Sequence, residues 1–321
     1  MLRMWTASAA LILTGAVLLT GCGNDKSEGK TSGSGEAKLK IETSFYPMYE
    51  FTKQVAGDLA DVESLIPAGV EPHDWEPSPK DIAKIQDADV FVYNGAGLEG
   101  WVDQVLSAAD GSSLTVVEAS KGQDMMEGTE EEDHEAEEAG HDDHDHGGLD
   151  PHVWLSPVRA VQEVRAIEAA LGKADPDNKE TYKANADAYA AKLGQLDQEF
   201  KSAFAQVKRK DFITQHAAFG YLAKDYGLEQ VPIAGLSPEQ EPSAEQMAGI
   251  VNFAREHKVK TIYFETLVTS KVADTIAKEV GAETAVLNPL EGLTDEEKAQ
   301  NLDYIGVMKQ NLEALKKGLN Q

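Results

Sequence analysis

The histidines are the residues of this sequence whose type and spacing could support chemistry. There are eight, and they fall into two groups. Four are scattered along the chain, and three of these, His73, His152 and His216, lie on predicted loops or helix starts. At least two of the three follow the carboxyl end of a predicted strand, where open parallel sheets bind their ligands. Three neutral imidazoles meeting at one point would form a zinc-type site, with a carboxylate or water in the fourth position.

Taken one at a time, these histidines have a plainer interpretation as hydrogen-bonded loop residues. The distances along the chain, 79 residues from His73 to His152 and 64 from there to His216, match no compact zinc motif. The fourth scattered histidine, His257, lies in Arg255-Glu256-His257-Lys258, which is typical of the exposed end of a helix. A cation is mildly favoured there, so we expect His257 to be structural.

The other four histidines belong to an acidic insert, residues 127–147. This insert contains eleven carboxylates and no lysine or arginine, a composition that cannot build a packed core. Its acidic first half is interpreted as a solvated tether. Imidazole repeated beside carboxylate at short spacing is what a borderline-soft divalent cation binds, so the insert is also a candidate accessory metal site. Its candidate ligands are His134, His141, His144 and His146, of which the last three carry the stronger signal.

The first residues have the pattern of a targeting segment. Met1–Thr20 contains one charge, Arg3, and an apolar run that is too short to span a membrane but right for a signal peptide. It leads to Leu-Thr-Gly-Cys22, which resembles the lipobox of bacterial lipoproteins, where cleavage precedes a cysteine that then receives lipid. An incidental cysteine is the alternative, but Cys22 is the only cysteine in the chain, so no disulfide competes for it. We therefore predict a signal peptide at 1–21 and a Gly/Ser-rich flexible tether at 22–37.

Length and charge limit the remaining possibilities. Removing residues 1–21 leaves 300 residues, enough for about two domains. The formal net charge of −27 becomes −28 when Arg3 leaves, and eleven of those negative charges lie in the insert. Such a balance argues against nucleic acid and against electrostatic adhesion to anionic lipid, and is compatible with attracting cations.

The body of the chain alternates predicted strands with predicted helices, which indicates βαβ units and mostly parallel sheets. Ser78, Ser243 and Thr294 each begin a helix-capping pattern. We predict an α/β fold of two lobes, each a mostly parallel sheet flanked by helices, covering residues 38–174 (with the His/acid-rich loop at 122–148) and 209–321. The predicted strands are 39–45, 62–67, 90–94 and 114–118, then 212–214, 230–234, 261–264 and 284–287.

Residues 175–208 between the lobes are predicted to form one long helix. Apolar residues recur there in steps of three and four, from Tyr182 to Val207, and place one stripe on one face. A helix from Pro176 to Lys208 would be about 50 Å long, which exceeds an ordinary crossover helix. We interpret it as a rigid connection between the two lobes.

Four segments resemble the metal motifs of the metal-binding lipoproteins of ABC transporters. They read GVEPHDWEPS at 69–78, DPHVWLSP at 150–157, HAAFGY at 216–221 and LNPLEGLT at 287–294. With the lipobox, the long helix and the insert, the resemblance covers essentially the whole chain. The zinc-uptake branch (ZnuA/AdcA type), which carries a His-rich acidic loop, is the most similar one. Many family members have aspartate in the fourth motif, whereas this chain has Glu291.

The resemblance implies a two-lobed, non-enzymatic binding protein that holds Zn(II) between its lobes. His73 and His152 would come from the first lobe, and His216 and Glu291 from the second, with water as the alternative fourth ligand. Glu265 would orient a ligand histidine, or equally form an ordinary cap or salt bridge. The protein would be lipid-anchored on the outer face of the cell membrane, monomeric, and would deliver zinc to a membrane permease.

Three alternatives remain at this level. Manganese-binding relatives tend to have a carboxylate where this chain has His216, which favours zinc. A zinc hydrolase would need an open coordination position and a general base, for which Glu71 or Glu265 would serve, but the sequence contains no His-Glu-x-x-His helix. A surface adhesin is the third, and no feature of the sequence identifies an adhesive face.

Overall fold

The computed structural model describes residues 38–108, 113–128 and 148–321, and the fold is that of the compact unit Lys38–Gln321. The predicted signal peptide, the tether with Cys22, and the four insert histidines His134, His141, His144 and His146 lie outside the described residues. No helix within these described ranges is both long enough and apolar enough to cross a membrane.

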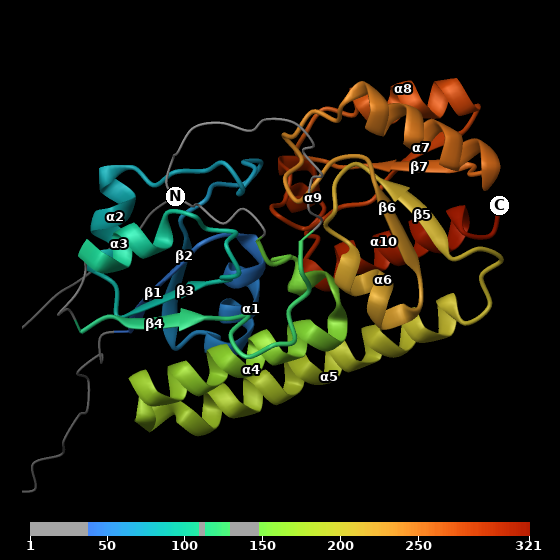
Figure 1. Ribbon diagram of the computed structural model, residues 1–321. Coiled ribbons are helices and arrows are strands. Elements are labelled where there is room, and N and C mark those ends of the chain that lie inside the picture. Colours follow the sequence, from blue (N-terminus) through green and yellow to red (C-terminus); the bar gives the residue numbers. More distant parts are fainter. Residues whose placement is uncertain (1–37, 109–112, 129–147) are drawn as a thin grey trace, which may run out of the picture. The chain divides into compact units, whose positions relative to one another are not determined.

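Two four-stranded parallel sheets form the two lobes (Figure 1). Their strand orders are β2-β1-β3-β4 and β6-β5-β7-β8. The strand order therefore reverses between β1 and β3 in the first sheet and between β5 and β7 in the second, and parallel sheets bind ligands at such switch points. In the first sheet Ile41 pairs with Val62 on one side and Val90 on the other. The two-lobed α/β prediction is therefore confirmed. The strands are β1 Leu39–Thr43, β2 Ala60–Ser64, β3 Val90–Tyr93, β4 Thr115–Glu118, β5 Asp211–Thr214, β6 Glu229–Pro232, β7 Thr261–Phe264 and β8 Glu283–Val286.

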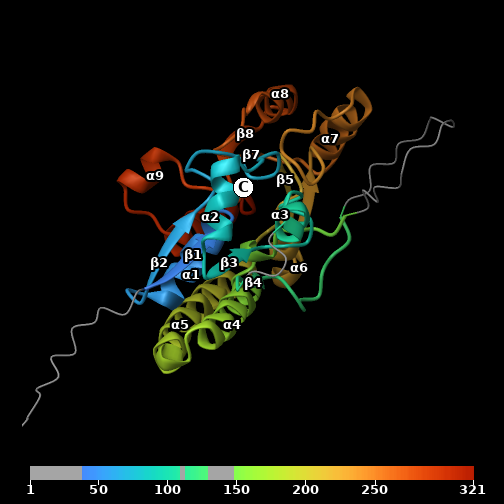
Figure 2. The ribbon, with the colours of Figure 1, turned by 90° about the vertical axis from the view of Figure 1, so that its left-hand side faces the viewer.

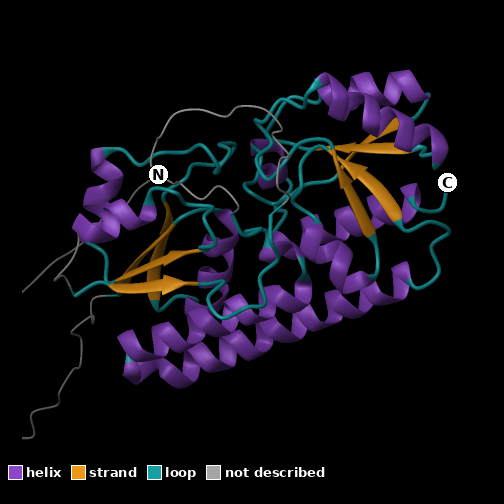
Figure 3. Cartoon of the chain, viewed as in Figure 1, coloured by secondary structure: helices purple, strands orange, loops and turns teal. Residues whose placement is uncertain are grey.

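Helices cover both faces of each sheet, as Figures 2 and 3 show. Those of the first lobe are α1 Tyr46–Ala56, α2 Pro79–Gln86 and α3 Val102–Ala108, followed by a 3-10 turn at Val153–Leu155 and α4 Pro157–Ala174. Those of the second lobe are α6 Gly220–Tyr226, α7 Ala244–Glu256, α8 Lys271–Val280, α9 Asp295–Ala299 and α10 Tyr304–Gly318. The predicted helix caps are confirmed: Ser78, Ser243 and Thr294 each accept a hydrogen bond from the backbone three residues on.

The long helix, α5 (Lys179–Phe204), is shorter than the 175–208 predicted from sequence. Its 26 residues span about 39 Å. At the start, Pro176–Asn178 form a 3-10 turn instead, stabilised because Asn178 Nδ2 and Tyr182 Oη both donate to the Asp175 carboxylate, at 2.7 and 2.8 Å. At the end, Lys210 Nζ donates to the Phe204 carbonyl at 2.6 Å.

The apolar stripe of α5 lies in the largest hydrophobic core, which extends from one lobe to the other. Tyr189 packs near Phe51 of α1, and Phe51 in turn makes an edge contact with Tyr304 of α10, with ring centroids 5.0 Å apart. Figure 1 shows α5 passing beneath both lobes, with α4 beside it under the first. Because one continuous core joins them, the two lobes are held together by packed side chains rather than by a linker alone.

Candidate metal centre

Four predicted site residues meet between the two sheets. His73, His152, His216 and Glu291 each offer one ligand atom, and these atoms all lie within 4.8 Å of one another. The Nε2 atom of His152 is 3.3 Å from Nε2 of His73 and 3.3 Å from Nε2 of His216. Oε1 of Glu291 lies 3.3, 3.5 and 3.3 Å from the three Nε2 atoms of His73, His152 and His216.

These five separations match five of the six edges of a small tetrahedron. A tetrahedral zinc ion with bonds of about 2.0–2.1 Å keeps its donor atoms about 3.3–3.4 Å apart. The three imidazoles turn their Nε2 atoms toward a common centre, although 218 residues separate His73 from Glu291 in sequence. Three nitrogens and one carboxylate oxygen are also the donor types that zinc takes in proteins.

Each of the four residues is supplied by the segment that follows a strand or precedes a helix. His216 follows β5 and Glu265 follows β7, the two strands between which the strand order of the second sheet reverses. His152 immediately precedes the 3-10 turn that leads into α4, and His73 lies on the loop between β2 and α2. This is the arrangement that carboxyl ends of parallel strands produce.

Glu291 is placed by a constrained turn after β8. The preceding residue, Leu290, has a φ of 57°, which is unfavourable for a side chain with a Cβ. Its amide donates to Oδ1 of Asn288 at 2.7 Å. The backbone amide of Asn288 donates in turn to Oδ1 of the buried Asn311, and Nδ2 of Asn311 donates to the backbone carbonyl of Asn288. This network maintains the unusual backbone conformation and directs the carboxylate of Glu291, which is 1% exposed, into the cluster.

Two of the histidines have their second ring nitrogen fixed by a carboxylate. Oδ1 of Asp150 is 2.8 Å from Nδ1 of His152 and also accepts from its backbone amide at 2.9 Å. Oε1 of Glu265 is 2.5 Å from Nδ1 of His216. A proton shared with a carboxylate at Nδ1 leaves the lone pair of Nε2 facing the cluster, which is how proteins orient metal-binding histidines.

His73 is held differently. Its backbone amide donates to both oxygens of Glu71, at 3.0 and 3.1 Å, but its Nδ1 has no hydrogen-bond partner among the described residues. Its side chain is 10% exposed, whereas those of His152 and His216 are fully buried. His73 is therefore the ligand candidate nearest to solvent.

Comparison with known proteins gives the relationship directly. Residues 41–318 match the family described as "Zinc-uptake complex component A periplasmic", ZnuA. This chain belongs to the ZnuA family.

The relatives span most of the sequence. It is 55% identical over 303 residues to the "High-affinity zinc uptake system protein ZnuA" of Bacillus subtilis, covering 94% of each chain. It is 48% identical over 308 residues to the "Zinc-binding lipoprotein AdcA" of Streptococcus pneumoniae, covering 95% of this chain but only 59% of AdcA. The crystal structure of the Zn(II)-bound ZnuA-like domain of that AdcA superimposes with a TM-score of 0.75 at 48% identity, over 89% of this chain and all of that domain.

The charges of this ZnuA-family site are strongly coupled. Burial alone would lower the pKa of His216, but the carboxylates of Glu265 and Glu291 outweigh it and raise that pKa to about 10. Burial would raise the pKa of Glu291, but the surrounding histidines hold it well below its usual value. For His73 burial prevails over Glu291, and its pKa is lowered.

One carboxylate near the cluster was not predicted as part of the zinc site. The sequence indicated Glu71 only as a possible base of a hydrolase, yet it lies 4.0 Å from Nε2 of His73. Burial, followed by repulsion from Glu291, raises the pKa of Glu71 to about 7. Asp150 was likewise given no role, although an aspartate two residues before a candidate ligand is a signal that could have identified it.

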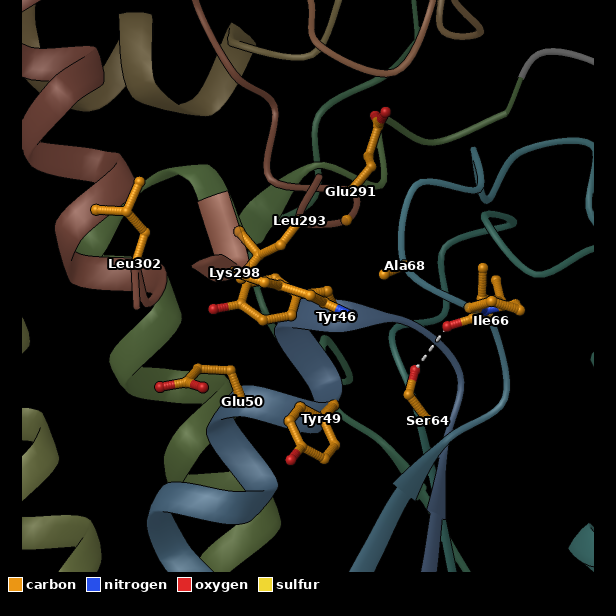
Figure 4. A pocket seen from close by; sticks show the side chains of 12 residues that line it. Tyr46, Tyr49, Glu50, Ser64, Ile66, Ala68, Glu291, Leu293, Lys298 and Leu302 are labelled. Atoms are coloured by element: carbon orange, nitrogen blue, oxygen red, sulfur yellow. Dashed lines mark hydrogen bonds between the residues drawn. The ribbon is translucent and has the colours of Figure 1, made fainter. Parts of the chain in front are cut away.

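The remaining predicted positions lie elsewhere. His257 is exposed at the end of α7, where its ring stacks on Phe253 at 3.9 Å and its Nδ1 is 3.5 Å from Asp211, as expected for a structural residue. A cavity of about 370 Å³ lies beside the Glu291 turn, between α1 and α9. Figure 4 shows that the carboxylate of Glu291 points away from Tyr46, Tyr49 and Glu50, which line this cavity, so the cavity is separate from the metal cluster.

Proposed function

We propose that this chain captures Zn(II) through His73, His152, His216 and Glu291. The observation that supports it most strongly is that five of the six donor separations are 3.3–3.5 Å and that all four donors lie within 4.8 Å of one another, close to the geometry of a tetrahedral zinc ion. Asp150 and Glu265 already fix Nδ1 of two of the three histidines, so that their Nε2 atoms face the cluster. The relatives named for zinc binding and zinc uptake support the same metal.

Zinc rather than manganese is the proposed cargo because of the donor set. Three imidazole nitrogens and one carboxylate oxygen suit zinc, whereas manganese sites are richer in oxygen and take more ligands. Within the described residues the cluster offers only these four ligand atoms at tetrahedral spacing. Water in place of Glu291 remains the alternative for the fourth position.

The biological role that we propose is delivery of zinc to an ABC-transporter permease, without catalysis. The chain would be processed after residue 21, anchored through a lipid on Cys22 and extended by the tether 22–37. The functional lobes would be 38–174 and 209–321, joined by the segment 175–208, on the outer face of the membrane and as a monomer. His134, His141, His144 and His146 would form a weaker accessory site that gathers zinc.

The single core that joins both lobes supports a further part of this proposal. Wide hinge bending would expose the buried residues of α5, such as Tyr182 and Phe200, at a large hydrophobic cost. Loading and release of zinc would therefore involve local movement of ligand loops.

Metal analysis of the protein purified without added metal tests the proposal. We expect zinc at about one tightly held equivalent per chain after brief treatment with a weak chelator, and loss of that equivalent in a His152→Ala/His216→Ala double variant. Competition between zinc and manganese against a chelator of known affinity should favour zinc. Manganese competing on equal terms would contradict the assignment of the cargo.

A further inference from the structure

The first turn of α6 contacts Asp150, the residue whose carboxylate orients His152. Oη of Tyr221 donates to the backbone carbonyl of Asp150 at 2.7 Å and accepts from the backbone amide of Met126 at 2.8 Å. Tyr221 is fully buried. One phenol therefore connects the second lobe to two segments of chain that lie on either side of the acidic insert.

Tyr221 is itself fixed by a buried cation. The guanidinium of Arg159, at the start of α4, lies 4.5 Å above the Tyr221 ring. That guanidinium also bonds both carboxylate oxygens of Asp225 on α6, at 2.8 and 3.3 Å, and the carbonyl of Asp124 at 2.9 Å. Because its ring lies under a cation and its hydroxyl bonds both Asp150 and Met126, Tyr221 has little freedom to move.

Gly220 makes the second contact with Asp150. A Cβ added at Gly220 would lie 2.9 Å from Oδ2 of Asp150 and 3.5 Å from Cε of Met126. Real side chains do not tolerate the first of these distances, so a methyl group there would displace the carboxylate. The other oxygen of that carboxylate, Oδ1, is the one that lies 2.8 Å from Nδ1 of His152.

We propose that Gly220 and Tyr221 are positioning residues of the zinc site: Tyr221 fixes the main chain of Asp150, and Gly220 leaves the space that its carboxylate occupies. Asp150 then holds His152 in the tautomer and orientation that zinc requires. The inference rests on the proposed zinc function. It adds two residues that act on the site through Asp150, the carboxylate behind the ligand His152, and not as ligands themselves.

The first test is Tyr221→Phe, which removes the hydroxyl and keeps the ring. Zinc affinity, measured by chelator competition, should weaken by about tenfold, at the lower end of what loss of an orienting partner costs. The visible absorption bands of the cobalt-loaded protein should shift, because cobalt in a tetrahedral site reports ligand geometry. Tyr182→Phe is the matched control, since Tyr182 is equally buried and donates to Asp175 at 2.8 Å, far from the cluster.

The second test separates positioning from general stability. Gly220→Ala introduces a better helix former at the start of α6, so it should not lower thermal stability through helix propensity. It should nevertheless weaken zinc binding and alter the cobalt spectrum, because the methyl displaces Asp150. Gly249→Ala is the matched control: Gly249 lies within α7, and nothing is within 4 Å of the added Cβ.

The outcomes distinguish this inference from the proposed function. Loss of zinc affinity in Tyr221→Phe and Gly220→Ala, with normal binding in both control variants, supports it. If Tyr221→Phe and Gly220→Ala bind zinc like the unaltered protein, or if Tyr182→Phe loses as much, the positioning role is wrong while the zinc site stands. If the unaltered protein binds no zinc tightly, the proposed function itself fails.

Discussion

The two buried histidines of the cluster differ from the third in what holds them. His152 and His216 are fully buried, and each presents its Nδ1 to a carboxylate, at 2.8 and 2.5 Å. His73 lies on a loop, is 10% exposed, and has no such partner at Nδ1 within the described ranges. The difference divides one site into a preorganised half and an adaptable half.

That division suggests how a buried site can both bind tightly and release its metal. Ligands that are already oriented add their full interaction energy, whereas a loop ligand spends part of its energy on becoming ordered. The His73 loop also carries Gly69 with a φ of 76°, a conformation that only glycine adopts easily, and nothing lies within 4 Å of where its Cβ would be. Movement of this loop alone would open the site while His152, His216 and Glu291 stay in place.

The largest effect should come from removing a preorganised ligand. His216→Ala should weaken zinc binding about a hundredfold to a thousandfold, if roughly 10–16 kcal/mol of binding energy is shared among four ligands. His73→Ala should cost less, by up to about tenfold, because ordering its loop already consumes part of its contribution. Chelator competition on both variants measures the difference, and dissociation of zinc should accelerate in both.

His257→Ala serves as the control for this pair, since His257 is exposed and distant from the cluster. It should bind zinc with unchanged affinity. A loss in His73→Ala that equals or exceeds the loss in His216→Ala would remove the distinction between the two halves of the site.

Much of this arrangement follows from local sequence patterns. The rest depends on tertiary contacts between residues that are distant in sequence. Strand and helix alternation predicted both sheets, and the capping residues Ser78, Ser243 and Thr294 mark helix starts because their hydrogen bonds are local. His73 and His216 could be selected because they follow predicted strands, and strand ends gather at one edge of a parallel sheet, whereas His152 could be selected because it lies ahead of a predicted helix. The positive φ of Leu290 could not be predicted, because it depends on Asn311, which lies 21 residues further along the chain.

The ends of α5 show the same limit. Proline at 176 and the apolar stripe predicted where the helix would be, but the 3-10 turn depends on the hydrogen bonds that Asn178 and Tyr182 both donate to the Asp175 carboxylate. Likewise, Asp150 and Glu71 look like ordinary acidic residues until the fold shows what they touch. Sequence patterns predicted the candidate ligands and Glu265, whereas the roles of Asp150 and Glu71 beside the ligands emerged only from packing.

The next effect concerns the carboxylate behind His216. Glu265→Gln keeps the shape and removes the charge that faces Nδ1, so zinc affinity should fall roughly 10–100-fold, as for loss of other orienting partners. Glu63→Gln is the control, because Glu63 is an exposed residue of β2 that pairs with Lys84 at 2.8 Å. Equal zinc binding by Glu265→Gln and the unaltered protein would mean that burial alone orients His216.

A smaller effect, about tenfold per pH unit, follows from the raised pKa of His216. Without metal, His216 is protonated at neutral pH because its pKa is about 10, and zinc can bind Nε2 only after that proton leaves. Apparent affinity should therefore keep rising between about pH 6.5 and 8.5, and calorimetry in buffers of different ionisation enthalpy should detect a released proton. A histidine with the ordinary pKa of about 6.5 would give a plateau above neutral pH instead.

Glu265→Gln sharpens this measurement. Since Glu265 is one of the two carboxylates that raise the pKa of His216, its neutralisation should reduce proton release and flatten the pH dependence. His73 should contribute no proton in either protein, because its pKa is lowered. Proton release that is independent of Glu265 would place the titrating group elsewhere in the cluster.

The smallest effect on the core site should come from deleting the acidic insert, Glu130–His146. The backbone amide of Gly128 donates to the carbonyl of Gly148 at 2.8 Å, and Glu127 and Leu149 form an antiparallel bridge. The deletion would leave Thr129 and Gly147 to join these two ends, a two-residue connection containing glycine, as tight hairpin turns require. The contacts of Met126 and Asp150 with Tyr221 would thus be retained.

Calorimetry should still find one tight zinc per chain with unchanged affinity, and only the weaker equivalents should disappear. Loss of the tight equivalent would mean that the insert, and not the four-residue cluster, holds the metal.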